Sequence, residues 1–179
     1  MQTDSGDSPP RAVLIAAVVV AVGALVGVLA FAVLRQPGPS AVPLTAVPAP
    51  QAESAECDAL VAALPEDVGD ATRVPILDPA PPGTAAWRAD DGGEPIVLRC
   101  GLDRPAEFVV GAALQSVDRV QWFRIAEPGG SRSTWYAVDR PVYVALTLPP
   151  NSGPTPIQKV SAAIEEVLPG EPIDPAPVG

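Results

Sequence analysis

Arginine and aromatic side chains gather in the strand-rich part of this 179-residue chain, and they are the residues best suited to bind another molecule. The arginines there are Arg99, Arg104, Arg119, Arg124, Arg132 and Arg140, and the aromatic residues are Trp87, Trp122, Trp135, Tyr136 and Tyr143. A guanidinium grips a carboxylate through a planar fork of donors, and arginine with aromatic residues is enriched at interfaces. The composition also fits tryptophans that fill a core and arginines that pair with acidic residues, so both interpretations stay open.

Histidine is absent from the chain, which excludes several catalytic classes. No Ser/His/Asp triad, no Cys/His nucleophile pair and no histidine metal ligand can form. A Ser/Lys dyad would need Lys159, but Ser161 lies two positions away on an expected helix, where the two side chains point in different directions. We therefore expect a protein that is not an enzyme and that holds no metal and no cofactor.

Adjacent carboxylates leave one catalytic alternative open. Glycoside hydrolysis uses two carboxyl groups that flank the scissile bond, and their distance in space cannot be read from a sequence. Asp90 and Asp91 stand in a glycine-rich turn, whereas Glu165 and Glu166 fall on an expected exposed helix face. Such positions are typical of ordinary surface residues. An accessory hydrolase of cell-wall glycan, using paired carboxylates, is the alternative function.

The two cysteines of the chain, Cys57 and Cys100, predict one structural disulfide. An isolated pair outside a metal-binding spacing is typical of an exported domain. Closing a loop of about 44 residues should stabilise the fold by roughly 4 kcal/mol. Two buried free thiols in a cytosolic domain are the competing interpretation.

Residues 12–34 form an apolar run that predicts an uncleaved transmembrane helix. A helix of that length reaches roughly 34 Å, enough for a hydrocarbon core of about 30 Å. A cleaved signal peptide is the alternative, although its apolar region is usually shorter. Gly23 and Gly27 have the spacing that lets two such helices pack as a homodimer, a spacing that also arises by chance. Together with the disulfide, the run predicts a single-pass protein of the cell membrane, with residues 1–11 as a cytoplasmic tail and the rest extracytoplasmic.

Composition also limits the source and the partners. Of eleven basic residues only Lys159 is a lysine, which is typical of a GC-rich bacterial genome, and the formal net charge is -10. An acidic chain is a poor partner for nucleic acid. Residues 35–55 are rich in proline and predict an extended stalk, and residues 170–179 predict a disordered tail.

The segment between them, residues 56–169, predicts one small α+β domain. A helix should begin after Ser54 and carry Cys57 on its buried face, and Thr155 should cap a second helix that Pro156 opens. The expected strands are residues 84–89, 95–100, 120–126, 133–138 and 142–148. They predict an antiparallel sheet of about four to five strands, joined to the first helix by the disulfide.

Several short segments of this domain point to a known family. They are Leu98-Arg99-Cys100-Gly101, Arg104-Pro105, Val117-Asp118, Trp122-Phe123 and Asp139-Arg140-Pro141-Val142-Tyr143-Val144. With these segments the chain resembles a family of uncharacterised, single-pass, membrane-anchored proteins from actinobacteria, domain of unknown function 3515. The resemblance implies an envelope-facing domain but supplies no activity, substrate or catalytic residue. Arg99, Arg140, Trp122 and Tyr143 lie in its segments and are our candidate binding residues.

From these observations we expect a membrane-anchored, extracytoplasmic binding or scaffold module of the bacterial cell envelope. Its partner would be an envelope protein or a cell-wall component.

Overall fold

The computed structural model describes residues 11–34, 41–127, 129 and 132–178. It divides into two compact units, Met1–Gly38 and Pro39–Gly179, which are described separately here. The expected cytoplasmic tail, apart from Arg11, and residues 35–40 of the expected stalk lie outside the described residues.

The first unit contains helix α1 (Arg11–Leu34). Its side chains are described at residue 13 and at residues 15–28, where the large apolar ones are exposed. Within the described residues, no helix combines the length and the apolar character that crossing a membrane requires, which overturns the transmembrane helix expected over 12–34. A Cβ added at Gly23 or Gly27 would meet nothing within 4 Å.

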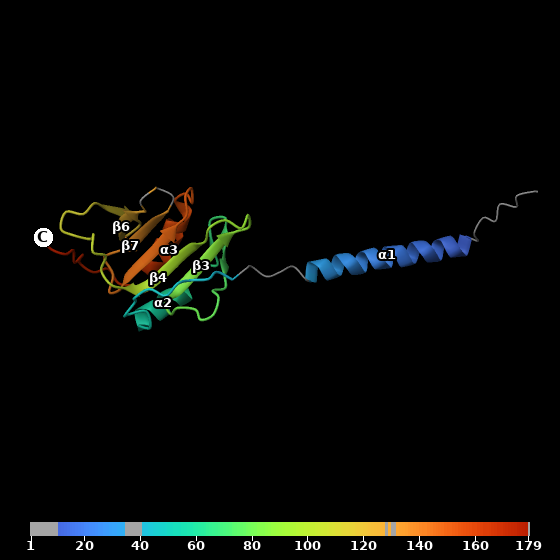
Figure 1. The fold of residues 1–179 in the computed structure, drawn as a ribbon, viewed down its shortest axis with the longest axis horizontal. Coiled ribbons are helices and arrows are strands. Elements are labelled where there is room, and N and C mark those ends of the chain that lie inside the picture. The colour runs from blue at the N-terminus through green and yellow to red at the C-terminus, as the bar shows by residue number, and fades with distance from the viewer. Residues whose placement is uncertain (1–10, 35–40, 128, 130–131, 179) are drawn as a thin grey trace, which may run out of the picture. The chain divides into compact units, whose positions relative to one another are not determined.

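The second unit is built on an eight-stranded antiparallel sheet with the order β1-β2-β3-β4-β8-β7-β6-β5. The strands are β1 (Asp67–Val68), β2 (Ala71–Val74), β3 (Thr84–Ala89), β4 (Ile96–Leu102), β5 (Leu114–Val117), β6 (Val120–Ala126), β7 (Ser133–Ala137) and β8 (Tyr143–Leu148). Figure 1 shows the long strands β3, β4, β6 and β7 within this sheet.

The expectation of about four to five strands was therefore wrong. The five expected strands correspond to β3, β4, β6, β7 and β8, whereas β1, β2 and β5 were not anticipated. These three strands have only two to four residues each, and two of them form the edges of the sheet. A strand so short shows almost no alternation of apolar and polar residues, and it forms here because a longer neighbour supplies its hydrogen-bond partners.

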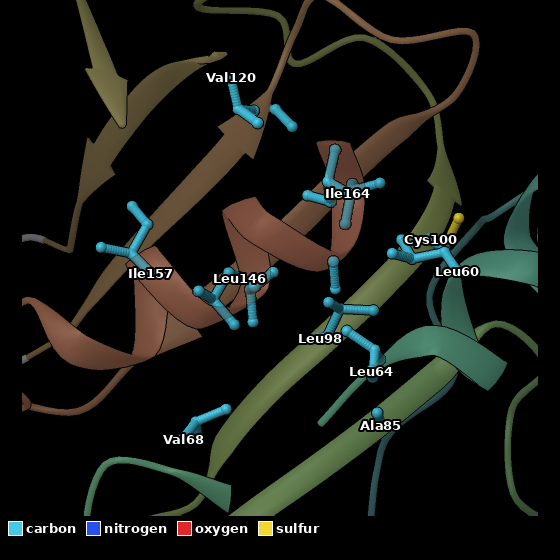
Figure 2. Close-up of a cluster of buried hydrophobic side chains, with 14 of the residues drawn as sticks. Leu60, Leu64, Val68, Ala85, Leu98, Cys100, Val120, Leu146, Ile157 and Ile164 are labelled. Atoms are coloured by element: carbon cyan, nitrogen blue, oxygen red, sulfur yellow. The ribbon is translucent and has the colours of Figure 1, made fainter. Parts of the chain in front are cut away.

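Helices α2 (Ala55–Ala63) and α3 (Thr155–Val167) contribute to the main core. The Ser54 hydroxyl accepts a hydrogen bond from the Cys57 amide at 3.3 Å, which confirms Ser54 as the N-cap of α2. Pro154, not Thr155, occupies the N-cap position of α3. Figure 2 shows Leu60 of α2 and Ile164 of α3 meeting the strand residues Leu98 and Leu146, all of them completely buried.

The predicted disulfide is confirmed: Cys57 of α2 is bonded to Cys100 of β4, with 5.6 Å between the Cα atoms. The next residue, Gly101, has a φ of +82° and forms a bulge between β4 and β8. A Cβ at Gly101 would lie 2.3 Å from the carbonyl carbon of Gln51, so the close approach of the two backbones requires glycine. The disulfide and this glycine together position the start of α2 against β4.

Both segments that flank the expected domain pack against it. Val42 is buried, its amide donates to the Pro75 carbonyl at 2.9 Å, and its carbonyl accepts from the Leu77 amide at 3.0 Å. At the other end, the Ala176 amide donates to the Phe108 carbonyl at 2.9 Å. Unlike the expected stalk and disordered tail, both segments pair backbone groups with distant parts of the chain, and Val42 also packs in a small cluster with Val74 and Ala86.

Removing the disulfide should destabilise the second unit. Replacing Cys57 and Cys100 together by alanine frees a loop of 43 residues in the unfolded chain. We expect the free energy of unfolding to fall by about 4 kcal/mol. Urea unfolding of the oxidised wild type and of the double variant measures the difference. Unfolding free energies that agree within about 1 kcal/mol would show that the bridge contributes little to stability.

Candidate functional site

Side chains alternate along β4 and give the sheet two different faces. Leu98 and Cys100 belong to the core cluster that includes α2 and α3, so Val97 and Arg99 point to the opposite face. On that opposite face the register places Arg99 beside Ala145 of β8, and Ala145 beside Tyr136 of β7. The face opposite the helices therefore carries Arg99 and Tyr136 among apolar neighbours such as Val97 and Ala145.

A hollow of about 370 Å³ lies on this face. We call it the arginine groove and define it by Arg88, Arg99, Arg132, Glu94 and Thr147, with residues 42–45 as a wall. Three arginines and one carboxylate line it, on a chain whose formal net charge is -10. Its volume falls within the size range of small-ligand sites, about 300–1,000 Å³.

Arg99 is a partly buried guanidinium in this groove. Its Nη2 donates to the Thr45 carbonyl at 3.3 Å, while its buried Nε has no hydrogen-bond partner among the described residues. Among the same residues, no carboxylate forms an ion pair with it. Burial lowers the pKa of Arg99, and the nearby Tyr136 acts in the opposite direction. Arginine nevertheless stays charged at neutral pH. Arg99 therefore carries a partly desolvated positive charge with donors available.

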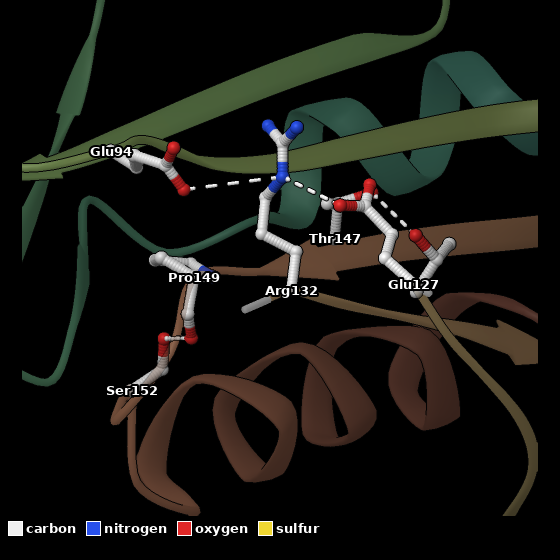
Figure 3. A network of polar contacts seen from close by, with 7 residues as sticks. Glu94, Glu127, Arg132, Thr147, Pro149 and Ser152 are labelled. Atoms are coloured by element: carbon white, nitrogen blue, oxygen red, sulfur yellow. Dashed lines mark hydrogen bonds and ion pairs between the residues drawn. The ribbon is translucent and has the colours of Figure 1, made fainter. Parts of the chain in front are cut away.

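Arg132 lies at the other side of the groove, between two glutamates (Figure 3). Its Nε is 3.3 Å from Glu127 Oε2 and 3.9 Å from Glu94 Oε2. All three side chains are substantially exposed, so these ion pairs contribute little to stability, about 0–1 kcal/mol each. Behind them, the hydroxyls of Thr134 and Thr147 are 3.1 Å apart. Because these ion pairs are weak, an anion that binds Arg132 more tightly than the glutamates could replace them at little energetic cost.

Of the four candidate binding residues, only Arg99 lies in the arginine groove. Trp122 is completely buried, and its Nε1 donates to Ser161 Oγ of α3 at 2.9 Å. Arg140 is also buried: its Nη1 is 3.0 Å from Asp139 Oδ1, and its Nη2 donates to the Arg119 carbonyl at 2.8 Å. Both side chains join elements of the fold.

Tyr143 lies on the groove face of the sheet but belongs to a separate cluster. Its hydroxyl donates to the Asp174 carbonyl at 3.5 Å, and Arg104 Nη1 contacts Asp174 Oδ2 at 2.8 Å. Burial raises the pKa of Tyr143, and Arg104 opposes this shift. The structure therefore uses Tyr143 to hold the C-terminal segment on the sheet.

The carboxylate pairs of the alternative function lie on different elements: Asp90 and Asp91 follow β3 in a turn, whereas Glu165 and Glu166 belong to α3. Glu165 forms an ion pair with Arg119, which lowers the pKa of this exposed carboxyl group. Asp91 lines a different hollow of about 390 Å³, together with Asp70 and Glu94. Within the described part of the chain, no three side chains of metal-ligating type are grouped so that they could hold a metal ion.

Sequence reasoning did not find Arg88 and Thr147 as groove residues. Thr147 stands on the groove face because its strand pairs with β4 through the contact Val97 with Thr147, across a long stretch of chain. Arg88 follows the completely buried Trp87 in β3, so alternation along this strand places it on the groove face. That alternation is a signal that could have found Arg88. The pairing of β4 with β8 had none in the sequence.

Replacing Arg140 tests its structural role. Arg140→Ala leaves the buried Asp139 carboxylate and the Arg119 carbonyl without their partner. We expect the free energy of unfolding to fall by about 3–5 kcal/mol, as for other broken buried ion pairs. Arg124→Ala is the matched control, because Arg124 is exposed and its ring contact with Trp135 predicts a loss of about 1 kcal/mol or less. Similar losses in urea unfolding for both variants would contradict this role.

Titration of the two tyrosines tests the electrostatics of the groove. Burial raises the pKa of Tyr136, Glu107 raises it further, and Arg99 lowers it. Arg99→Gln should therefore raise the pKa of Tyr136 while leaving that of Tyr143 unchanged. Absorbance of the phenolate during an alkaline titration measures both, because the chain has only these two tyrosines. A Tyr136 pKa that is unchanged in Arg99→Gln would contradict the contact.

The same shifts give the sign of the pH dependence of stability. Both tyrosines have folded-state pKa values above the unfolded value of about 10, so their contribution is fully present below that pH. Stability should fall as the pH rises through the folded-state pKa values. Thermal unfolding midpoints between pH 9 and pH 12 measure this loss.

Comparisons with known proteins add one finding to this geometry. A family of proteins of unknown function, DUF3515, matches residues 18–173. No curated protein and no solved structure matches the chain. The matched residues include α2, α3 and all eight strands, as well as Arg99 and the disulfide. Because this match covers most of its length, the chain belongs to the DUF3515 family of proteins of unknown function.

Proposed function

We propose that this protein is an extracytoplasmic, non-enzymatic binding module of the bacterial cell envelope, and that its arginine groove takes an anionic group of an envelope component. The observation that carries the proposal is Arg99, a partly buried guanidinium that no carboxylate of the described residues neutralises. The ligand would be a carboxylate or a phosphate, the two groups that fit the fork of arginine donors.

The fold has already removed part of the water from Arg99. The energetic cost of that desolvation is met when the chain folds, so an arriving anion meets a charge that is positioned and incompletely solvated. In such a place an ion pair is stronger than on an open surface, because the local dielectric is lower. Arg132 lies in the same groove, where its ion pairs with Glu94 and Glu127 are substantially exposed.

The chemistry of the lining supports binding more than catalysis. Arginine does not release its proton near neutral pH, so the three arginines cannot act as acid or base. Among the described residues that line the groove, Glu94 is the one carboxylate, and it contacts Arg132. Glycoside hydrolysis needs two carboxyl groups about the scissile bond.

The disulfide supports the proposed compartment. Disulfides form and persist in oxidising environments, and they are rare where cellular reductants keep thiols reduced. The bond from Cys57 to Cys100 joins α2 to the central strand β4, and both cysteines are buried in the core rather than placed at the surface.

Retention on cell-wall material tests the function. The purified full chain is mixed with insoluble bacterial cell wall, and the bound fraction is measured as a function of wall concentration. We expect Arg99→Gln to weaken retention about tenfold or more, since a hydrogen-bonded ion pair contributes roughly 1.5–3 kcal/mol. Arg124→Gln removes the same charge at an exposed position whose ring contact is with Trp135, and should leave retention unchanged.

Three readouts make this experiment decisive. Circular dichroism and an intact disulfide establish that Arg99→Gln remains folded. Equal retention of wild type, Arg99→Gln and Arg124→Gln would refute binding through the groove. New reducing ends in the wall material, produced by the wild type, would refute the non-enzymatic part of the proposal.

A further inference from the structure

Arg99 borders a second hollow besides the arginine groove. This hollow of about 310 Å³ is lined mainly by apolar side chains, among them Val47, Ala49, Pro79, Pro81 and Pro82. We call it the proline hollow. Thr84, the register partner of Arg99 in β3, also lines it. Arg99 therefore stands at a boundary, with a cationic groove on one side and an apolar hollow on the other.

The walls of the proline hollow are held in place by the fold. Gly83 has a φ of +63°, and a Cβ there would lie 2.9 Å from the Ala52 carbonyl oxygen, so residues 51–52 pack directly on this turn. The Gln51 amide donates to the Gly101 carbonyl at 3.1 Å. Proline also restricts the backbone of residues 79–82. A hollow built in this way exists before any ligand arrives, which lowers the entropic cost of binding.

Residues 42–49 run along both hollows and contact Arg99 between them. Residues 42–45 line the arginine groove, residues 46–49 contribute to the proline hollow, and the Thr45 carbonyl between them accepts from Arg99 Nη2. The guanidinium is thus held where the two hollows adjoin. A ligand that occupies both hollows would lie beside Arg99, which lines each of them.

We propose that the ligand of the arginine groove is a small anionic amphiphile, whose charged group contacts Arg99 and whose apolar part occupies the proline hollow. This inference rests on the proposed function and names its ligand class. Charge complementarity selects the anionic end, because Arg99 has no carboxylate partner among the described residues. The apolar lining that begins at the same side chain selects an apolar group joined directly to that anion.

Three small molecules separate the contributions of charge and apolar surface. Octanoate carries both parts, acetate carries only the carboxylate, and 1-octanol carries the apolar chain without the charge. Each is titrated into the full chain by isothermal calorimetry, below the concentration at which octanoate forms micelles. We expect octanoate to bind at least about tenfold more tightly than either of the others, because each buried methylene contributes roughly 0.8 kcal/mol.

Three variants locate the binding. Arg99→Gln should reduce octanoate affinity to the level of 1-octanol. Val47→Gln should reduce the advantage of octanoate over acetate about threefold or more, because Val47 lines the hollow and is 44% exposed, so its replacement spares the core. Val110→Gln is the matched control: Val110 is 58% exposed and is not part of the hollow's lining, and octanoate affinity should not change.

The outcomes distinguish this inference from the function on which it rests. Equal, Arg99-dependent affinities for octanoate and acetate would overturn the amphiphile and leave the anion-binding function intact. Equal affinities for octanoate and 1-octanol, both unchanged in Arg99→Gln, would also overturn it. So would a Val47→Gln variant in which octanoate keeps its full affinity advantage over acetate. Absence of any Arg99-dependent anion binding would overturn both proposals.

Discussion

The strict alternation of side chains along β4 is the constraint on which the rest of this structure depends. Leu98 and Cys100 face the helices, where one fills the core and the other forms the disulfide to α2. Arg99 stands between them and must point to the opposite face. Gly101 then lets the backbone of residues 51–52 approach. Four consecutive residues thus place a core side chain, the disulfide, the charge of Arg99 and one wall of the proline hollow. Shifting the strand by one position would move Leu98 and Cys100 to the groove face and Arg99 to the core face.

The arginines of this acidic chain differ in what surrounds them. Arg104, Arg119 and Arg140 each pair with a carboxylate and hold segments of the fold together. Arg99 is different, because its surroundings are a carbonyl, a tyrosine and two hollows. The interpretation that arginines pair with acidic residues therefore holds for Arg104, Arg119 and Arg140, whereas binding through Arg99 is our proposal. Local surroundings decide between them, whereas residue type does not.

Parts of the fold could be predicted because their signals are local. The cap at Ser54 and the five longer strands follow from periodicity and turn residues close in sequence. Strands β1, β2 and β5 could not be predicted, since their partners rather than their own residues define them. The same holds for Val42 and Ala176, whose proline-rich surroundings resemble linkers until a distant backbone supplies the hydrogen bonds. Within the candidate site, Arg99 was predicted, and Thr147 was missed because only strand pairing brings it there.

By itself the sequence determined the disulfide, the absence of histidine chemistry, the mixed helix and sheet architecture and the acidic character, because composition and short-range patterns carry each of them. Only the tertiary structure decided which arginine is a candidate for binding. Arg99 and Arg140 occur in similar segments and look equivalent along the chain. Arg140 is buried beside Asp139, whereas Arg99 lies between two hollows and has no carboxylate partner among the described residues. The free energy of an ion depends on the water and charges around it, and those are set by residues far away in the sequence.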